Sequence, residues 1–246
     1  MSDLSQRRAL VTGASAGIGE ATARALAAAG AHVTLAARRL DRVQAIAAEL
    51  EGADAVALDV TDYDGVRSAL SGREFDLVVA NAGLARGVEG LQDGDPAEWS
   101  EVIDTNVKGV LNTVRATLAP MLDAGRGDVI LLGSVAGRQV YPGGGVYCAS
   151  KYAVRAIYEG LRQDAGGRGV RFSTVDPGMV KTDFSRVRFR GDEQRAAAVY
   201  EGVDPLTPQD VAESIVWIAT RPPHMNVGEL VLWATAQSST TKITRA

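Results

Sequence analysis

Residues 8–30 read RALVTGASAGIGEATARALAAAG, and they give the strongest indication of the fold class. It begins with a short apolar run that contains β-branched residues, as is typical of a buried strand. The alanine-rich segment from Glu20 predicts a helix that ends at Gly30. A glycine-rich turn joins the two elements. A strand that passes through such a turn into a helix is the opening unit of an α/β protein.

The same alternation of strand and helix continues along the chain. Six further strands are expected at 31–39, 53–60, 75–83, 127–134, 170–178 and 228–234. Helices are expected at 40–50, 62–72, 96–125, 147–165 and 207–222. We therefore expect a doubly wound, Rossmann-like α/β fold with a parallel seven-stranded sheet and helices on both faces. The whole chain, 1–246, is expected to form one domain, with a cofactor-binding half at 1–95, a catalytic half at 96–246 and a capping loop at about 183–205.

Composition narrows the class of partner. The 246 residues are 46% hydrophobic and carry a net charge of −4, which argues against nucleic acid as the main ligand. No apolar run approaches the roughly 20 residues that span a bilayer, and the first residues lack the apolar segment of a signal peptide. The single cysteine, Cys148, excludes an internal disulfide, so we expect a cytoplasmic protein. With only two histidines, no cluster has metal-ligand spacing, and no metal is expected.

The turn between the first strand and helix predicts a phosphate site. Its glycines would let backbone amides approach a pyrophosphate at the helix N-terminus. The spacing G-x-x-x-G-x-G differs from the usual dinucleotide fingerprint, and a tight turn without a ligand would explain it equally well. The candidate cofactor residues in this turn are Gly13, Ser15, Ala16, Gly17, Ile18 and Gly19.

The end of the second strand favours NADP(H) over NAD(H). NAD-specific sites place an acidic residue there to bind the ribose 2′-hydroxyl. Here the positions are Arg38 and Arg39, whose guanidinium groups suit a 2′-phosphate. The alternative is that both arginines are merely solvated at the start of the next helix. Further cofactor contacts are expected at the ends of the next two strands, from Asp59, Val60, Asn81, Ala82 and Gly83.

Residues 134–151, SVAGRQVYPGGGVYCASK, carry the candidate chemistry. Ser134 follows an expected strand, and Tyr147 and Lys151 are four positions apart on an expected helix, so they share one face. A cation beside a tyrosine lowers the pKa of the phenol, which would make Tyr147 an acid/base near neutral pH. The alternative for Y-x-x-x-K alone is an exposed helix pair with no chemical role.

These motifs together, T-G-x-x-x-G-x-G, N-A-G, Ser134 and Y-x-x-x-K in this order, resemble the short-chain dehydrogenase/reductase family over essentially the whole chain. The resemblance implies that Tyr147 is the general acid/base, that Lys151 lowers its pKa and binds the nicotinamide ribose, and that Ser134 holds the substrate oxygen. It also implies that Asn106 kinks the long helix and anchors a relay water. The segment that would touch the nicotinamide comprises Pro177, Gly178, Val180 and Thr182. Ala80 replaces a second asparagine found in many members.

A closer resemblance is to NADP-dependent 3-hydroxy acid dehydrogenases, which also oxidise serine and allo-threonine. It rests on NAGLARG, on TDFSRVRFRGDE and on the segment from Leu206 to Ser238. Clavulanate-pathway aldehyde reductases share the last feature, so a reductase of a specialised aldehyde or ketone is the alternative. Family membership further implies a homotetramer, or a homodimer, built on the long helix and the Tyr147 helix.

The small-molecule substrate is expected to carry a carboxylate. Arginines alternate along the capping loop, and bidentate pairing suits an acid. Arg188 and Arg190 are the leading candidates and Arg86 is another, whereas a solvated basic loop is the alternative. Two other functional classes remain open from the sequence: a non-catalytic NADP-sensing protein, and a lyase or epimerase that retains its nucleotide.

Overall fold

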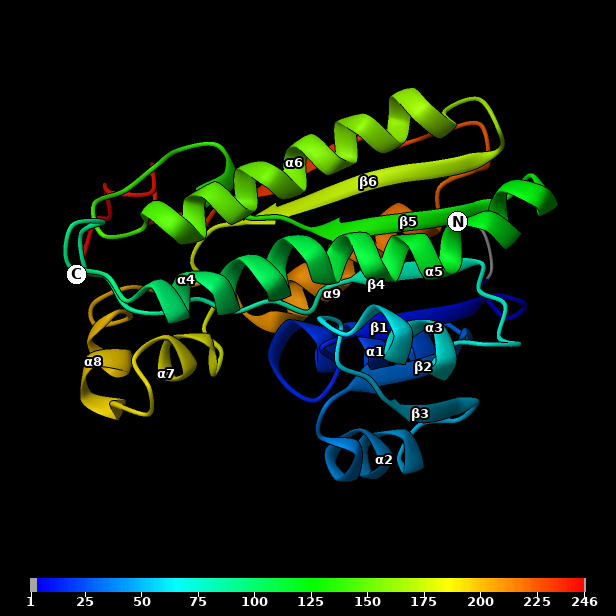
Figure 1. Ribbon diagram of the computed structural model, residues 1–246, viewed down its shortest axis with the longest axis horizontal. Coiled ribbons are helices and arrows are strands. Elements are labelled where there is room, and N and C mark those ends of the chain that lie inside the picture. The colour runs from blue at the N-terminus through cyan, green and yellow to red at the C-terminus, as the bar shows by residue number, and fades with distance from the viewer. Residues whose placement is uncertain (1–3, 246) are drawn as a thin grey trace.

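The structure, a computed structural model, describes residues 4–245 and contains one parallel sheet of seven strands (Figure 1). Their order in the sheet is β3-β2-β1-β4-β5-β6-β7, and every neighbouring pair is parallel. The strands are β1 (Arg8–Thr12), β2 (His32–Ala37), β3 (Ala53–Ala57), β4 (Leu77–Ala80), β5 (Gly127–Leu132), β6 (Val170–Pro177) and β7 (Glu229–Leu232). The doubly wound fold expected from the sequence is confirmed.

Helices cover both faces of the sheet. One face packs against α1 (Gly17–Ala28), α2 (Leu40–Ala48) and α9 (Pro208–Ala219). The other packs against α3 (Tyr63–Ala69), α5 (Gly109–Ala124) and α6 (Gly145–Ala165). Successive side chains of a strand point to opposite faces, so Ala9 and Val11 enter the first core while Leu10 enters the second.

The strand order reverses between β1 and β4, and this is where ligands bind in open α/β sheets. The first crossover runs from β1 through α1 to β2, away from β4. The loops that leave β1 and β4 therefore meet: a Cβ atom added to Gly13 would lie 2.9 Å from Ala82 Cα.

The long helical segment is not a regular helix throughout. Helix α4 (Pro96–Ile103) continues into a π-helical turn, Asp104–Lys108, and then into α5. Asn106 is buried within this turn, and α4 packs against α6. The irregularity expected at Asn106 is thus present as one widened turn.

Two short helices, α7 (Phe184–Arg188) and α8 (Glu193–Ala198), lie at the carboxyl ends of the strands. In Figure 1 they occupy the left end of the molecule, where β5 and β6 point and where the C-terminal trace also returns. Most of the chemistry-bearing residues expected from the sequence lie at this end.

The buried face of α6 differs from the apolar stripe read from the sequence. The apolar residues Ala149, Ala153, Ile157 and Leu161 recur at helical spacing along this segment. In the structure Ala149 is exposed, and the buried residues are Cys148, Ser150, Lys151, Val154, Tyr158 and Ala165. Polar residues take part of the inner face because the first turns of α6 border a cavity.

Candidate active site

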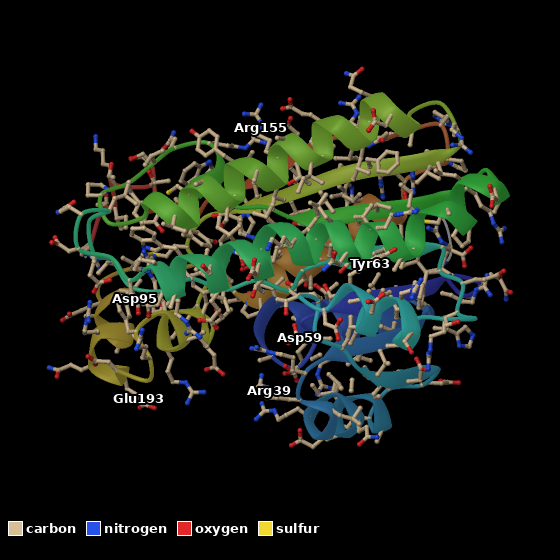
Figure 2. All side chains as sticks on the ribbon, viewed as in Figure 1. Arg39, Asp59, Tyr63, Asp95, Arg155 and Glu193 are labelled. Atoms are coloured by element: carbon tan, nitrogen blue, oxygen red, sulfur yellow. The ribbon has the colours of Figure 1, made fainter. Side chains whose placement is uncertain are left out.

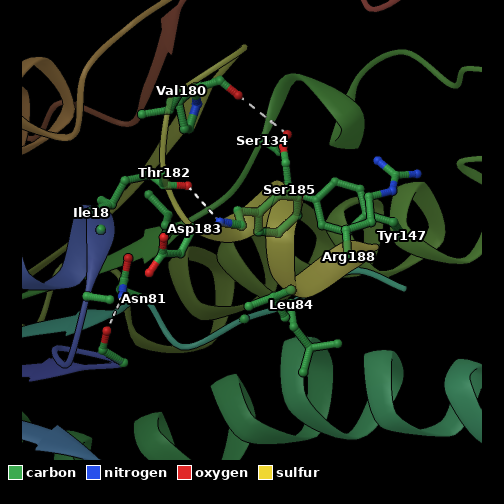
Figure 3. Close-up of a pocket in the computed structure, with 18 of the residues that line it drawn as sticks. Ile18, Asn81, Leu84, Ser134, Tyr147, Val180, Thr182, Asp183, Ser185 and Arg188 are labelled. Carbon is green, nitrogen blue, oxygen red and sulfur yellow. Dashed lines mark hydrogen bonds between the residues drawn. The ribbon is translucent and has the colours of Figure 1, made fainter. Parts of the chain in front are cut away.

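A cavity of about 870 Å³ runs across the carboxyl ends of the strands, and residues at or just beyond the ends of β1 to β6 line it. Such a volume suits a cofactor together with a small substrate. Every site residue expected from the sequence lines this cavity, with the exception of Asn106. Figure 3 shows Ile18 and Asn81 on one side of it and Ser134, Tyr147 and Arg188 on the other.

The glycine-rich turn forms the wall beside β1. Gly13 and Gly17 have positive φ values of 67° and 58°, a conformation that L side chains rarely adopt. At Gly19 a Cβ atom would lie 2.3 Å from Gly13 O and 2.5 Å from Asn81 Nδ2. The turn therefore needs glycine at these positions, and it leaves the N-terminus of α1 open to the cavity, where an anion is favoured.

Two arginines stand at the end of β2, where NAD-specific sites have a carboxylate. Arg38 and Arg39 are both exposed and both line the cavity. Arg39 donates from Nη2 to the Ser15 hydroxyl at 2.9 Å, which brings its guanidinium to the edge of the glycine-rich turn. This corner is cationic, with hydroxyl and guanidinium donors together, and such a set matches a phosphate.

Asp59 lies near the same corner, after β3. Figure 2 shows Arg39 and Asp59 in the lower part of the molecule, and both residues line the cavity. Burial alone would raise the pKa of the Asp59 carboxyl, but hydrogen bonds from the Thr61 backbone and hydroxyl and the charge of Arg38 outweigh it. The net effect is a lowered pKa, so Asp59 is an acceptor at neutral pH.

The Asn81 side chain has a structural use that the sequence did not reveal. Its Nδ2 donates to Thr12 O at 2.8 Å, and its backbone N–H donates to the Thr12 hydroxyl at 3.1 Å. Ala82 N donates to the same hydroxyl at 3.1 Å. Asn81 thus fastens the end of β4 to the end of β1, and the backbone of Ala82 and Gly83 is left along the cavity wall.

Ser134 and Tyr147 face each other across the other half of the cavity. Ser134 ends the loop after β5 and caps a short 3₁₀ helix, Val135–Gly137, by accepting from Ala136 N at 3.1 Å. Its hydroxyl donates to Pro177 O at 3.4 Å, which links it to the end of β6. Tyr147 projects from the first turn of α6 into the same space (Figure 3).

The expectation that Lys151 lowers the pKa of Tyr147 is wrong for this structure. Burial raises the pKa of the Tyr147 phenol well above its ordinary value, and the neighbouring Tyr141 adds to the effect. A hydrogen bond with Ser134 and the charge of Arg188 act in the opposite direction but do not compensate. The physical reason is that the phenolate would lose its hydration in the cavity wall. Tyr147 therefore holds its proton at neutral pH.

The Lys151 ammonium lies 5.9 Å from the centre of the Tyr147 ring, and it donates to Leu132 O at 2.8 Å. Burial lowers the pKa of Lys151 to about 8, although the charge of Asp176 opposes the shift. Lys151 is thus a cation at neutral pH, although its pKa lies only slightly above that pH.

Asn106 lies behind the cavity and braces it. Its Oδ1 accepts from Leu84 N at 2.8 Å, and its Nδ2 donates to Leu84 O at 2.8 Å and to Ser150 Oγ at 3.0 Å. Ser150 in turn donates to Tyr147 O at 2.7 Å. The side chain of Asn106 therefore ties the loop after β4 to the first turn of α6, from which both Tyr147 and Lys151 project.

The three candidate arginines differ in their partners. Arg86 makes a two-pronged ion pair with Glu101, with both N–O distances at 2.7 Å, and Arg190 pairs with Glu98. Within residues 4–245, Arg188 forms no ion pair with a carboxylate. It donates to Gly87 O at 2.7 Å and to the Tyr141 hydroxyl at 3.0 Å, and its guanidinium lies 5.5 Å from the centre of the Tyr141 ring.

One nitrogen of Arg188 has no partner. Its Nη2 is buried and makes no hydrogen bond within the described part of the chain. A buried guanidinium nitrogen left unpaired costs free energy, so its environment favours an acceptor from a bound molecule.

Several lining residues were not anticipated from the sequence. Tyr141 stands in a glycine-rich loop and Met179 follows β6, and the others belong to the capping segment or to the C-terminal tail, where no periodic pattern marks them. They are Tyr141, Met179, Phe184, Ser185, Tyr200, Gln237, Thr240 and Ile243.

Among residues 4–245, no helix is long and apolar enough to cross a membrane. Over the same range no group of three or more His, Cys, Asp or Glu side chains is arranged to hold a metal ion.

Comparison with known proteins finds a dehydrogenase family and relatives named as dehydrogenases. Residues 7–193 match the sequence profile of the family described as short chain dehydrogenase. A serine 3-dehydrogenase of Agrobacterium fabrum is 40% identical over 235 residues, covering 93% of this chain and 94% of the relative. An NADP-dependent 3-hydroxy acid dehydrogenase of Salmonella typhimurium is 40% identical over 236 residues (93% and 95%).

Two further matches bear on ligands. A sulfoacetaldehyde reductase of Chromohalobacter salexigens is 42% identical over 238 residues, covering 93% of this chain and 94% of the relative. Among solved structures, the closed form of serine dehydrogenase complexed with NADP+ superposes with a TM-score of 0.93 at 36% identity, covering 97% of this chain and 99% of that one.

Proposed function

Because this chain belongs to the short-chain dehydrogenase family, we propose that it is an NADP(H)-dependent oxidoreductase that interconverts a small hydroxy compound and its carbonyl form. The observation that carries the proposal is the convergence of Ser134, Tyr147 and Lys151 in one cavity whose other end presents Arg38 and Arg39. Reversible hydride transfer is the chemistry that such a nucleotide supplies when bound.

The cavity fits this nucleotide. The open N-terminus of α1 and the amides of the glycine-rich turn would hold the pyrophosphate, and Arg38 and Arg39 the 2′-phosphate. Further along the cavity wall, Asp59 and Val60 would meet the adenine, and Asn81, Ala82 and Gly83 the adenosine ribose. At the reacting end, Tyr147 and Lys151 would hold the nicotinamide ribose, and the segment with Pro177, Gly178, Val180 and Thr182 the nicotinamide.

The residues of this chain supply the proton path. Ser134 holds the reacting oxygen of the substrate by a hydrogen bond. Tyr147 keeps its phenolic proton at neutral pH, so it is poised to donate that proton to a carbonyl oxygen as the oxygen becomes an alkoxide. In the reverse direction the tyrosinate removes the hydroxyl proton. Asn106 keeps Tyr147 and Lys151 in place through Ser150 and Leu84.

The substrate class follows from a shared feature of the relatives' named substrates. Serine and other 3-hydroxy acids carry a carboxylate on the carbon next to the carbinol carbon, and sulfoacetaldehyde carries a sulfonate on the carbon next to its carbonyl carbon. We therefore infer a substrate with an anionic group at that position, with serine-type 3-hydroxy acids as the leading members.

Arg188 is the residue best suited to hold the anionic group. Its unpaired Nη2 lies in the same cavity as Tyr147, whose pKa its charge affects. By sequence Arg190 was a leading candidate with Arg188, and Arg86 was a further one, but Glu98 pairs with Arg190 and Glu101 with Arg86. The segment 183–205, which contains Arg188, would cap the bound substrate.

The assay for this function is absorbance at 340 nm with NADP or NAD and a panel of serine, allo-threonine, 3-hydroxypropionate, sulfoacetaldehyde and neutral secondary alcohols. We expect turnover of the anionic compounds with a preference for NADP. Turnover restricted to neutral alcohols or aldehydes would contradict the proposed substrate class, and a preference for NAD would contradict the role of Arg38 and Arg39.

The matched pair Arg188→Leu and Arg190→Leu tests the anion site. Arg188→Leu should raise KM for anionic substrates by tenfold or more, because one charge-assisted hydrogen bond contributes about 1.5–3 kcal/mol. The KM for a neutral alcohol should change little. Arg190→Leu serves as the control, since it removes an exposed ion pair and should leave both KM values nearly unchanged. Equal effects of Arg188→Leu on acids and neutral alcohols would contradict the assignment.

Quaternary structure and location are part of the same proposal. The half-exposed residues Ala153 and Ile157 of α6 and exposed Leu111 of α5 leave apolar surface that would support a homotetramer, or a homodimer. We propose a cytoplasmic enzyme on the basis of a single, unpaired cysteine. Sedimentation velocity that gave only a monomer would contradict the oligomer.

A further inference from the structure

The C-terminal segment, residues 236–245, folds back on itself instead of trailing into solvent. Ser238 N donates to Lys242 O at 3.0 Å, and Thr244 N donates to Ala236 O at 2.8 Å. Gln237 and Ile243 form an isolated antiparallel bridge across the base of this closed loop. Gln237 is thereby fixed at the base of the loop, with 7% of its surface exposed.

This C-terminal loop is attached to the cavity on three sides. Gln237 Oε1 accepts from Met179 N at 2.8 Å, just beyond β6. Thr240 N donates at 3.2 Å to the Gln139 side chain, in the segment between β5 and α6. Arg245 donates to the carbonyl oxygen of Glu201, just beyond α8. The loop therefore forms a wall of the cavity, to which Gln237, Thr240 and Ile243 contribute.

The two ends of the Gln237 carboxamide are used differently. Its oxygen is occupied by Met179 N, and it lies so close to Gly178 that a Cβ atom added there would be 2.3 Å away. Its nitrogen, with two N–H donors, makes no hydrogen bond within residues 4–245. A side chain this buried that lines a cavity with two free donors is suited to a ligand acceptor.

Gln237 lies against the same turn as Ser134, which is proposed to hold the substrate. It rests against the turn Pro177–Gly178–Met179, and the Ser134 hydroxyl donates to Pro177 O at 3.4 Å. The same turn thus supports both Ser134 and Gln237. The carboxamide cannot rotate to exchange its ends, because an N–H group would then face Met179 N.

We propose that Gln237 is a specificity-determining residue whose amide nitrogen donates a hydrogen bond to a non-reacting oxygen of the bound substrate. The assignment rests on the proposed function for the nature of that substrate. The carboxamide oxygen meanwhile fixes the turn at 177–179. A substrate with an acceptor oxygen on this side of the cavity is favoured over an analogue without one.

Gln237→Glu separates the two uses of this side chain. Glutamate keeps an acceptor for Met179 N, but it replaces the N–H donors with a second oxygen and adds negative charge. Gln237→Met removes both uses at nearly the same length. Gln163→Glu, on the exposed end of α6, controls for the added charge.

The measurement is the binding of 3-hydroxypropionate to the enzyme–NADPH complex, followed by NADPH fluorescence. Cofactor and ligand are both reduced in this complex, so no turnover occurs and affinity is read directly. Gln237→Glu should raise the Kd for 3-hydroxypropionate by tenfold or more, with the thermal midpoint and NADPH affinity close to those of the wild type. Gln163→Glu should leave the Kd unchanged.

Other results of these binding measurements would contradict the role of Gln237 or the proposed function. An unchanged Kd in Gln237→Glu, together with a weakened Gln237→Met variant, would show that only the carboxamide oxygen matters and would overturn the proposal. Absence of saturable binding by the wild type would overturn it as well. If the wild type binds, the variant loses affinity and no compound in the oxidation panel turns over, the proposed function fails while the assignment of Gln237 stands.

Discussion

At the scale of single residues, Tyr147 is partly buried and Lys151 is buried, so each would have to carry charge with little hydration. Burial raises the pKa of Tyr147 and lowers that of Lys151 to about 8. Burial therefore favours the neutral form of each. Near pH 7 the phenol is neutral and the lysine is still a cation, which is the protonation state needed to reduce a carbonyl.

The lowered pKa of Lys151 predicts how the stability of the protein changes with pH. Its pKa in the folded protein, about 8, lies below the ordinary value of 10.5, so the unfolded chain holds this proton more firmly. Below pH 8 both states are protonated and the burial cost is present in full. Between pH 8 and 10.5 the unfolded state binds more protons, so stability attributable to this group rises with pH. The gap between 10.5 and about 8 corresponds to roughly 3 kcal/mol.

Urea unfolding at several pH values from 7 to 10 tests the predicted rise in stability with pH. The unfolding free energy of the wild type, relative to that of Lys151→Met, should increase as the pH rises above 8. The exposed Lys181, changed to methionine, is the control and should give a curve parallel to the wild type. Parallel curves for Lys151→Met too would show that Lys151 is not desolvated.

At the scale of elements, the β1–α1 turn is the part of the site that tolerates substitution least. Gly19 belongs to the first turn of α1 and faces backbone and Asn81, neither of which is free to move away. Gly160 is a useful contrast, because it lies within α6 and a Cβ atom there would meet nothing within 4 Å.

Gly19→Ala should weaken NADPH binding by more than tenfold and lower the thermal midpoint, since Gly13 must shift to admit the methyl group. Gly160→Ala should leave binding unchanged and stabilise the protein by up to about 1 kcal/mol, because alanine is the better helix former. Fluorescence titration and thermal unfolding measure both. Tight NADPH binding by Gly19→Ala would contradict the phosphate site at this turn.

The elements differ in how far the sequence predicts them. Strands such as Leu77–Ala80 are buried on both faces, so they read as continuous apolar runs and were predicted at their positions. The π-helical turn at Asp104–Lys108 has no distinct composition, and only the family resemblance pointed to Asn106. The C-terminal segment 236–245 reads as a polar tail, because its contacts are hydrogen bonds that follow no periodicity.

The site residues also differ in how far the sequence predicts them. The motif residues Ser134, Tyr147 and Lys151 were brought together as expected, because spacing on a helix and strand ends fix their positions. The pKa of Tyr147 could not be foreseen, since it depends on how deeply the surrounding loops bury the ring. Nor could the sequence separate Arg188 from Arg190, whose partner Glu98 lies 92 positions away.

At the scale of the whole molecule, the strand order gives the cavity its two ends. Reversal between β1 and β4 opens the sheet where the glycine-rich turn meets Asn81, while β5 and β6 place Ser134 next to Pro177. The short helix α7, the residues Val199 and Tyr200 that follow α8, and the C-terminal loop then close the far side, at the left end of Figure 1. A dinucleotide and a small substrate thus share one cavity that is formed by the carboxyl ends of the strands.

The central claim is that Tyr147 transfers the proton in an NADP-dependent redox reaction at this cavity. The most direct measurement compares wild type and Tyr147→Phe at 340 nm, for NADPH consumption with sulfoacetaldehyde and for NADPH formation from NADP with its alcohol product. NADPH fluorescence is titrated in parallel. We expect Tyr147→Phe to lower kcat by at least a hundredfold, within the range of general acid catalysis, while NADPH still binds. Turnover by Tyr147→Phe at the wild-type rate would contradict it.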